Sequence, residues 1–301
     1  MAPQKVRLAA ESFNTVFRVT TASAVYALRV GAALQVHPGG TAAVEAAWHR
    51  RLRRQGVYVP DVLANVDGES ATLVLDGRAE SAPRVCVMFE WVTGRSLRTC
   101  LTGRRAAALG RLSARLQQDA EEWFPPGADD VLAADRVLYW RLPDQLPAAG
   151  SRFGFGSLFV DALARAQSVL DWLWGNPPHP PRLVHGDLTP ANVIVSPQHG
   201  LVPMDFQDTV RGFEVQDLAF SVAALRRRPD GARLADAFRS GYRECRRWPD
   251  ASPALFESLI VARALNQMNL TLNIRGIDGL DSYVTGHAER VRAWMRRPSV
   301  L

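Results

Sequence analysis

Short apolar runs with polar residues between them fill the first ninety residues of the chain. Residues 16–19 and 25–30 form two β-like runs on either side of a Thr-Ala-Ser turn, which predicts adjacent antiparallel strands. Two more β-like runs follow at residues 71–75 and 84–91. We therefore expect these four runs to form strands of a sheet.

A helical pattern separates the two pairs of strands, at residues 41–55. Val44, Trp48 and Leu52 recur at four-residue spacing and so lie on one face of a helix. Gly56 stands where a helix can end, because glycine readily adopts the left-handed conformation that closes many helices. The predicted order is strand, strand, helix, strand, strand.

The pattern changes from Leu97 onward, where alanine- and leucine-rich stretches such as 106–123 and 158–174 predict long helices. One β-like island interrupts them. It begins at residues 182–185 and continues as a predicted hairpin, whose two strands flank a Pro-Gln-His-Gly turn and lie at 193–196 and 201–204.

These patterns predict an α+β protein in three parts. Residues 1–90 form an N-terminal lobe built on the strands, residues 91–95 a hinge, and residues 96–301 a mainly helical C-terminal lobe. No internal repeat or low-complexity linker is visible in the sequence, so the short connection after the last N-terminal strand is the predicted boundary.

Arginine supplies nearly all of the positive charge, because Lys5 is the only lysine. The formal net charge is +6, but the arginines are scattered and no nucleic-acid reading module is recognisable, so we expect no nucleic-acid partner. Neither a membrane-length apolar stretch nor a secretory signal pattern occurs, which predicts a cytoplasmic protein with no membrane partner. Three cysteines without CxxC spacing predict no disulfide framework and no zinc site.

The strongest chemical signal is His-Gly-Asp-Leu-Thr-Pro-Ala-Asn at residues 185–192, followed by Asp-Phe-Gln-Asp at 205–208. Phosphoryl transfer needs hard oxygen ligands for Mg²⁺ and a separate carboxylate for the acceptor hydroxyl. Asn192 and Asp205 flank the predicted hairpin and can converge on a metal, whereas Asp187 would act as a base toward the acceptor. Each residue alone is more often a turn former, and it is their order and spacing that favour phosphotransfer.

This pattern resembles the aminoglycoside phosphotransferase and choline kinase superfamily. The resemblance spans roughly residues 8–225 and includes the segments 14–19, 26–30, 45–48, 89–94 and 212–219. It implies a two-lobed, protein-kinase-like fold with an antiparallel-sheet N-terminal lobe. It also implies transfer of the γ-phosphoryl group of ATP or GTP to a hydroxyl of a small molecule, with Mg²⁺ at Asn192 and Asp205 and with Asp187 as the catalytic base.

The same resemblance assigns the nucleotide-binding positions. The phosphate-gripping residue falls on Arg29 and its helix partner on Glu45, although many relatives carry lysine there. Lys5 stands too early in the chain to serve, and a guanidinium can bind phosphate oxygens in a bidentate way. The alternative is a surface arginine that closes a strand.

No Gly-rich GxGxxG loop joins the first two strands. Ser12 and Asn14 in that turn, with backbone N–H groups, would bind the β-phosphate instead, although both are also ordinary turn residues. At the hinge, the resemblance places the purine edge against the backbone of Glu90 and Val92. Backbone contacts of this kind do not distinguish ATP from GTP.

Three further polar residues are expected to support the catalytic loop. Asp217 would accept backbone N–H groups of the loop, and His185 would anchor it by packing and hydrogen bonding. Asp208 would either order the loop or assist a second Mg²⁺.

The acceptor pocket is expected on the C-terminal lobe. On the helix predicted at 254–275, four polar residues lie near one face: Arg263, Asn266, Asn269 and Asn273. Such a stripe suits a polyhydroxylated or partly anionic acceptor, and a solvated helix face is the alternative. The basic run at 289–297 argues against a strongly cationic acceptor. By family analogy alone, the acceptor is an antibiotic or a hydroxylated metabolite, which makes drug inactivation or self-resistance a hypothesis.

Two rival functions follow from the same residues. A catalytically silent nucleotide-binding module of the same fold is the alternative that arginine at position 29 suggests. Protein-directed kinase activity is disfavoured, because Gly186 replaces the arginine usual in protein kinases and no Ala-Pro-Glu segment follows Asp205. The sequence leaves both a monomer and a homodimer open.

Overall fold

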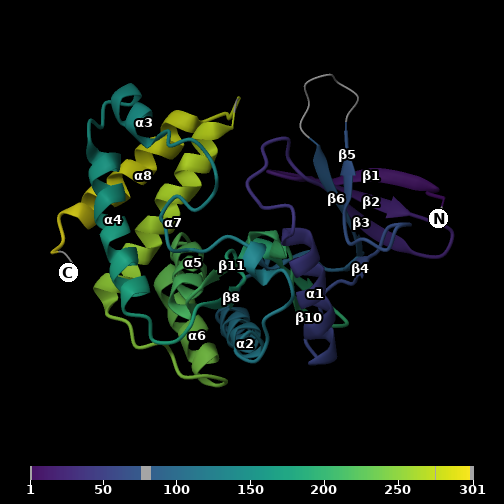
Figure 1. Cartoon of the computed structure of the whole chain (residues 1–301). Helices are drawn as coiled ribbons and strands as arrows, with labels where there is room; N and C mark the ends of the chain where they lie inside the picture. Colours follow the sequence, from purple (N-terminus) through teal and green to yellow (C-terminus); the bar gives the residue numbers. More distant parts are fainter. Residues whose placement is uncertain (1, 76–82, 275, 299–301) are drawn as a thin grey trace.

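The computed structural model describes residues 2–75, 83–274 and 276–298. An antiparallel sheet forms the N-terminal part of the chain, to the right in Figure 1, and helices form most of the rest. The strand order is β1-β2-β3-β6-β4, and β5 also pairs with β6. The strands are β1 Lys5–Glu11, β2 Thr15–Thr20, β3 Val25–Val30, β4 Val62–Leu63, β5 Thr72–Val74 and β6 Arg84–Glu90. The predicted α+β fold with a sheet-based N-terminal region is confirmed.

Two strands of this sheet were not predicted. β4 contains only two residues, and all seven residues of β1 are exposed, so burial imposes no apolar pattern on β1. Lys5 is therefore the first residue of a strand, where it pairs with Thr20, and does not precede the first strand as predicted. The other four strands lie within two residues of their predicted bounds.

The predicted N-terminal helix is present as α1, Thr41–Arg54. Val44, Trp48 and Leu52 are buried on one face, as their spacing predicts. The ring of Trp48 packs edge-on against Phe206, with 5.2 Å between ring centroids. Because Phe206 follows the hairpin predicted at residues 193–204, this contact joins α1 to the helical part of the molecule.

Among the described residues, the helical part contains seven α-helices, and the 3₁₀ turn η1 Leu97–Thr99 precedes the first of them. The helices are α2 Gly103–Asp119, α3 Leu146–Arg152, α4 Leu158–Gly175, α5 Glu214–Arg226, α6 Gly231–Arg243, α7 Pro253–Asn273 and α8 Leu280–Met295. The predicted end of α7, Arg275, lies outside the described residues. α2 and α6 cross closely, since a Cβ on Gly110 would overlap the carbonyl oxygen of Phe238.

The β-like island forms two small sheets inside the helical part. β8 (Arg182–Val184) pairs with β11 (Val210–Gly212), which the sequence analysis missed. The predicted hairpin is present as β9 (Val193–Ser196) and β10 (Gly200–Pro203), and β7 (Arg95–Ser96) pairs with β9. The connections between these strands hold the residues of the predicted catalytic motif.

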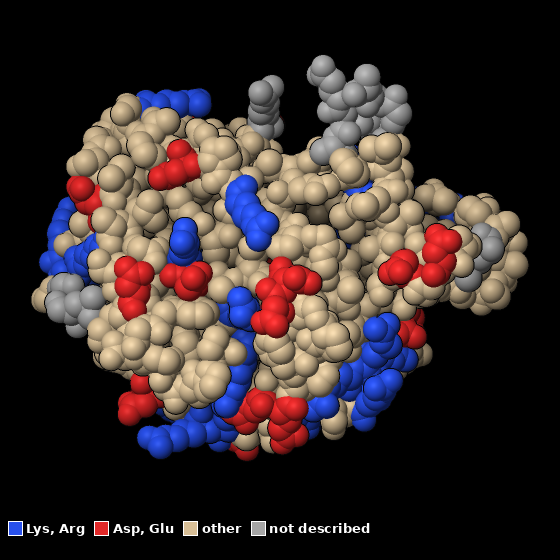
Figure 2. Space-filling view, in the orientation of Figure 1, with Lys and Arg blue, Asp and Glu red and all other residues tan. Residues whose placement is uncertain are grey.

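Charges of both signs share the visible surface. On the face shown in Figure 2, basic and acidic side chains lie interspersed, so no surface of one charge spans that face. Among the described residues, no helix is both long enough and apolar enough to cross a membrane.

Candidate active site

The candidate catalytic loop begins at Gly186, which adopts a left-handed conformation with φ of 77°. A Cβ at this position would overlap the carbonyl oxygen of Asp208, so both backbone angle and space favour glycine here. His185 lies just before it, with Nε2 3.0 Å from the carbonyl oxygen of Met204, and its Nδ1 accepts the Asp187 N–H at 3.3 Å. Burial lowers the pKa of His185 to about 4, which makes it a neutral anchor at pH 7.

Asp217 holds the same loop from the first turn of α5. Its Oδ1 accepts the backbone N–H of Gly186 at 2.9 Å, and its Oδ2 accepts from Nε2 of Gln117 at 3.3 Å. The side chain is buried, and burial raises its pKa to about 6. These contacts are the ones expected of a residue that supports the loop.

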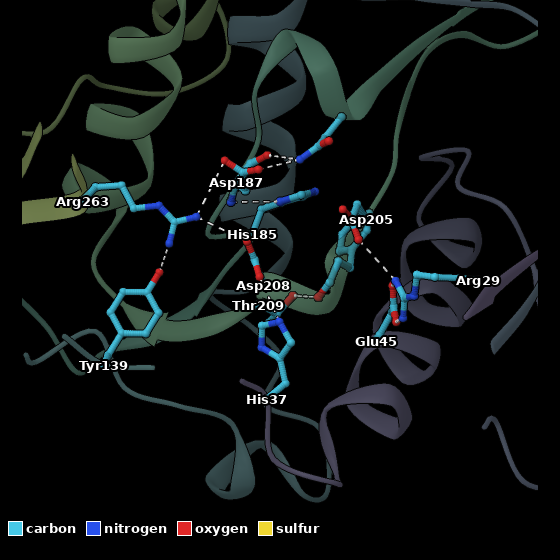
Figure 3. A network of polar contacts seen from close by, with 12 residues as sticks. Arg29, His37, Glu45, Tyr139, His185, Asp187, Asp205, Asp208, Thr209 and Arg263 are labelled. Carbon is cyan, nitrogen blue, oxygen red and sulfur yellow. Dashed lines mark hydrogen bonds and ion pairs between the residues drawn. The ribbon is translucent and has the colours of Figure 1, made fainter. Parts of the chain in front are cut away.

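Asp187 projects from the loop toward α7, as Figure 3 shows. Nδ2 of Asn192 donates to Asp187 Oδ2 at 2.7 Å and to the Asp187 carbonyl oxygen at 3.0 Å, which fixes the carboxylate in place. Burial raises the pKa of Asp187, the charge of Arg263 opposes this effect, and the charges of Asp208 and Asp205 add to it, so that the pKa is about 7. A carboxylate with such a pKa is a competent base near neutral pH.

Asp205 is brought next to Asn192 by the β9–β10 hairpin. The N–H of Met204 donates to the carbonyl oxygen of Asn192 at 2.8 Å, which closes the base of the hairpin. Asp205 has a φ of 62°, the only positive value among the described residues other than glycine. Partial burial, together with the charges of Asp208 and Glu45 and against that of Arg29, raises the pKa of this carboxyl to about 6.

Arg29 and Glu45 form a buried ion pair between β3 and α1. The two guanidinium nitrogens lie 2.9 Å and 2.5 Å from the two carboxylate oxygens, which makes the pair bidentate. Nη1 of Arg29 also lies 3.3 Å from Oδ1 of Asp205. Burial alone would raise the pKa of Glu45, but Arg29 outweighs burial and the pKa is lowered, so both groups are charged. The alternative of a surface arginine is wrong, because Arg29 is buried.

Asp208 lies at the centre of a second set of charges, below Asp187 in Figure 3. Its Oδ1 is 3.1 Å from Nε2 of His37, and its Oδ2 is 3.3 Å from Nη2 of Arg263. Burial alone would raise the pKa of Asp208, but these two neighbours reverse the effect and lower it. Arg263 also contacts the hydroxyl of Tyr139. The sequence analysis missed His37 and Tyr139, because both lie in irregular segments without a recognisable motif.

The four polar residues of α7 have different surroundings from those predicted. A solvated helix face is wrong for Arg263, Asn266 and Asn269, since all three are buried. Asn269 accepts the Gln145 N–H at 2.8 Å and donates to the carbonyl oxygen of Pro143 at 3.1 Å.

Asn273 donates to the same carbonyl oxygen of Pro143 at 3.0 Å. Of the four residues, Arg263 alone lines the pocket beside Asp187. The amides of Asn269 and Asn273 are instead engaged in holding the segment before α3. Two of the four predicted acceptor contacts are therefore structural hydrogen bonds.

The turn between β1 and β2 contains Ser12 and Asn14. The N–H of Ser12 donates to the carbonyl oxygen of Asn14 at 2.9 Å, so this donor is engaged within the turn. Ser12 is exposed, whereas Asn14 is buried and lines a cavity together with Arg29 and Glu45. Of the two predicted phosphate-binding residues, Asn14 thus lies nearer to the charged pair.

The connection after β6 contains Glu90 and Val92. The N–H of Glu90 donates to the carbonyl oxygen of Asp61 at 2.9 Å, and its carboxylate binds Tyr58 and Arg53 at 2.9 Å and 3.0 Å. Glu90 can therefore offer a purine only its backbone carbonyl. A donor at this hinge would have to come from Val92.

Comparisons with known proteins identify the fold and the family of this chain. The fold is that of kinase-like phosphotransferases. The model of the phosphotransferase enzyme family matches residues 6–253, so the chain belongs to that family. An uncharacterized protein of Deinococcus radiodurans is 32% identical over 242 residues, which cover 75% of this chain and 65% of that protein. The chain thus spans slightly less than two thirds of the length of this relative.

Solved structures of small-molecule kinases have the same fold. An amicoumacin kinase in complex with AMP-PNP, Ca²⁺ and its ligand aligns with a TM-score of 0.72 and 17% identity, over 97% of this chain and 88% of that one. A microcompartment-associated aminopropanol kinase aligns with a TM-score of 0.69 and 25% identity, over 96% of this chain and 90% of that one. A spectinomycin phosphotransferase in complex with ADP and spectinomycin aligns with a TM-score of 0.60 and 12% identity, over 99% and 91%.

Proposed function

We propose that this protein transfers the γ-phosphoryl group of ATP or GTP to a hydroxyl group of a small molecule. The observation that carries the proposal is the position of Asp187, hydrogen-bonded by Asn192 and lining a pocket large enough for an acceptor. The nucleotide complexes of the structural neighbours support a nucleoside triphosphate as the donor.

In this reaction Asp187 orients the acceptor hydroxyl and receives its proton. The acceptor oxygen then bonds to the γ-phosphorus, and the bond to the bridging oxygen of the nucleoside diphosphate breaks. A pKa of about 7 lets Asp187 be deprotonated before the reaction and take up a proton during it. His185 is neutral and engaged with Met204, which leaves the base role to Asp187.

Asn192 and Asp205 are the residues that we propose to hold Mg²⁺. A carboxylate and an amide oxygen are hard ligands, so these two side chains would suit this ion. The raised pKa of Asp205 also fits a site for a cation, because partial burial and the charges of Asp208 and Glu45 disfavour its own charge in the free protein. When bound, the metal supplies charge neutralisation for the β- and γ-phosphates.

Arg29 takes the place of the usual lysine in this proposal. Its bidentate pair with Glu45 holds the guanidinium in one orientation, and Nη1 faces Asp205, where the phosphates are expected. A guanidinium can bind two phosphate oxygens from this position. Asn14, the Glu90 carbonyl and the Val92 N–H are the further nucleotide contacts that we propose.

A coupled assay of nucleoside diphosphate release tests the function. The assay contains Mg²⁺, ATP or GTP, and a panel of antibiotics, amino alcohols, sugars and hydroxy acids. Asp187→Asn should lower acceptor-dependent turnover by about 10³-fold or more while calorimetry still detects nucleotide binding. Asp129→Asn is the matched control, because its side chain is 84% exposed and lies outside the proposed site.

The silent-module alternative makes the opposite prediction. Such a protein would bind nucleotide with Mg²⁺ but would release no diphosphate with any acceptor, and Asp187→Asn would change nothing. Failure to bind nucleotide at all would overturn both readings. Drug inactivation and a role in metabolism are separated by which members of the acceptor panel stimulate release.

A further inference from the structure

A pocket of about 600 Å³ opens beside Asp187, between the catalytic loop and helices α5, α7 and α8. This size falls within the range of small-molecule sites, which is about 300–1,000 Å³. Apolar side chains form part of its wall, among them Leu101, Phe220 and Ile260. Because Asp187 also lines it, a molecule in this pocket can present a hydroxyl to the proposed base.

The polar lining of the pocket is strongly basic. Six arginines line it: Arg98, Arg226, Arg227, Arg228, Arg263 and Arg290. They come from η1, from the end of α5 and the turn after it, from α7 and from α8, so the tertiary fold gathers them. The acidic side chains in the lining are two, Asp187 and Glu257.

Acidic partners neutralise only part of this charge. Arg226 and Arg297 both contact Glu257, so the second carboxylate of the pocket is already engaged. Arg228 lies 3.7 Å from Asp230. Arg263 lies 3.3 Å from Asp208. Within the described residues, by contrast, no ion pair involves the remaining three arginines of the pocket, which are Arg98, Arg227 and Arg290.

Arg227 and Arg290 act on each other as like charges. Burial lowers the pKa of Arg290, and the neighbouring charge of Arg227 lowers it further. His287 lies beside them on α8, and burial together with Arg290 and Arg227 lowers its pKa to about 4. A negative group between these side chains would relieve their repulsion, whereas an ammonium group would add to it.

We propose that the acceptor is an anionic hydroxylated molecule, whose carboxylate or phosphate group is bound by Arg227 and Arg290 while its hydroxyl lies at Asp187. This inference rests on the proposed kinase function and names its substrate class. Arginine suits the role because its planar guanidinium binds carboxylate and phosphate oxygens in pairs. The apolar wall at Phe220 and Ile260 would hold the carbon skeleton between the two ends.

Matched acceptors test the charge preference directly. One set consists of glycerate, glycerol and 3-aminopropane-1,2-diol, and a second of gluconate, sorbitol and glucamine. A third set, glucose 6-phosphate, glucose and 6-amino-6-deoxyglucose, separates phosphate recognition from carboxylate recognition. Within each set, calorimetry with the ADP- and Mg²⁺-loaded protein should show the anion binding at least tenfold tighter than its neutral and cationic counterparts.

Two double variants locate the site. Arg227→Gln/Arg290→Gln should weaken binding of the preferred anion about tenfold or more, since hydrogen bonds to charged groups have large effects. Arg243→Gln/Arg247→Gln also removes two positive charges, but from exposed positions outside the pocket, and should leave anion binding unchanged. Nucleotide binding should be unaffected in both variants, which also shows that they are folded.

The outcomes separate this inference from the proposed function. If neutral or amine acceptors bind and are phosphorylated in preference, the kinase function stands and the anionic class is wrong. If anions bind through Arg227 and Arg290 but no acceptor is phosphorylated, the anion site stands and the kinase function fails. Absence of binding by every anion up to about 10 mM, or equal weakening by the control variant, overturns the inference.

Discussion

The guanidinium of Arg263 lies beside the carboxylate of Asp187, with 3.8 Å between Nη2 and Oδ1. Arg263 comes from α7 and is buried, and it also contacts Asp208 at 3.3 Å. Its positive charge opposes the burial that raises the pKa of Asp187. Arg263 thus lowers the pKa of Asp187 relative to burial alone, in addition to lining the pocket beside it.

Removal of this charge should move the pH profile of the enzyme. In Arg263→Gln the pKa of Asp187 should rise above about 7, because the neighbouring cation is lost. Asp187 must be deprotonated to act as a base, so activity is lost as pH falls through its pKa. The acid limb of kcat/KM, measured from pH 5 to 9, should therefore shift to higher pH.

Arg263→Lys provides the control for this prediction. It retains a positive charge near Asp187 and should leave the acid limb closer to that of the unmodified protein, even though lysine forms fewer directed hydrogen bonds. An identical profile in Arg263→Gln and the unmodified protein would exclude an electrostatic role for Arg263.

The buried pair of Arg29 and Glu45 should contribute strongly to both stability and nucleotide binding. Glu45→Gln leaves a buried guanidinium without its bidentate partner, which should cost about 3 kcal/mol of unfolding free energy. The KM for nucleotide should rise as Arg29 loses its orientation. Urea unfolding and nucleotide titration measure the two effects.

A surface pair gives the comparison for Glu45→Gln. The side chains of Arg111 and Glu244 are 37% and 54% exposed, so Glu244→Gln should cost less than about 1 kcal/mol and leave the nucleotide KM unchanged. Similar losses of unfolding free energy in the two variants would mean that the buried Arg29–Glu45 pair stabilises the protein no more than a surface pair does.

A side chain at position 186 should destabilise the protein by steric overlap. Substitution of a second glycine, Gly56, measures the backbone strain without that overlap. Gly186 and Gly56 have nearly the same φ, 77° and 76°, but a Cβ on Gly56 would meet nothing within 4 Å. Gly56→Ala should cost about 1 kcal/mol, the strain of the left-handed conformation alone. Gly186→Ala should cost distinctly more and lower turnover, because the catalytic loop must move away from Asp208. Equal costs for the two variants, measured by urea unfolding, would refute the steric argument.

Asp217 should make stability depend on pH. Its pKa is raised to about 6 in the folded protein and is about 3.9 in an unfolded chain, so unfolding releases a proton between these values. The contribution of this group to stability is therefore full below about pH 4 and is lost as pH rises through 6. With the side chain 1% exposed, the change is about 3 kcal/mol.

Asp217→Asn isolates this contribution. The amide oxygen can still accept the Gly186 N–H but does not titrate. The difference in unfolding free energy between the unmodified protein and Asp217→Asn should therefore fall by about 3 kcal/mol from pH 4 to pH 7. Asp236→Asn, at a side chain that is 75% exposed, should show no such change. A difference that is constant with pH would contradict the raised pKa.

The predictable parts of this protein are those whose pattern is local. The apolar residues of helix α1 recur at four-residue spacing, and the β9–β10 hairpin has a turn between two β-like runs. The bounds of both elements were therefore predicted to within two residues. Asp187 and Asn192 lie in one loop, where a short spacing determines which atoms can meet. β1 could not be found in the same way, because an entirely exposed strand needs no apolar pattern.

The sequence by itself therefore determined the fold class, the order of the main elements and the candidate catalytic motif. Only the tertiary structure decided which distant residues meet that motif. It brings His37 and Arg263 into contact with Asp208, and it places Asn269 and Asn273 within hydrogen-bonding distance of the Pro143 carbonyl oxygen. It also brings arginines from four elements together around one pocket. The physical reason is that charges interact across space, so their effect depends on how helices and loops pack and not on their separation along the chain.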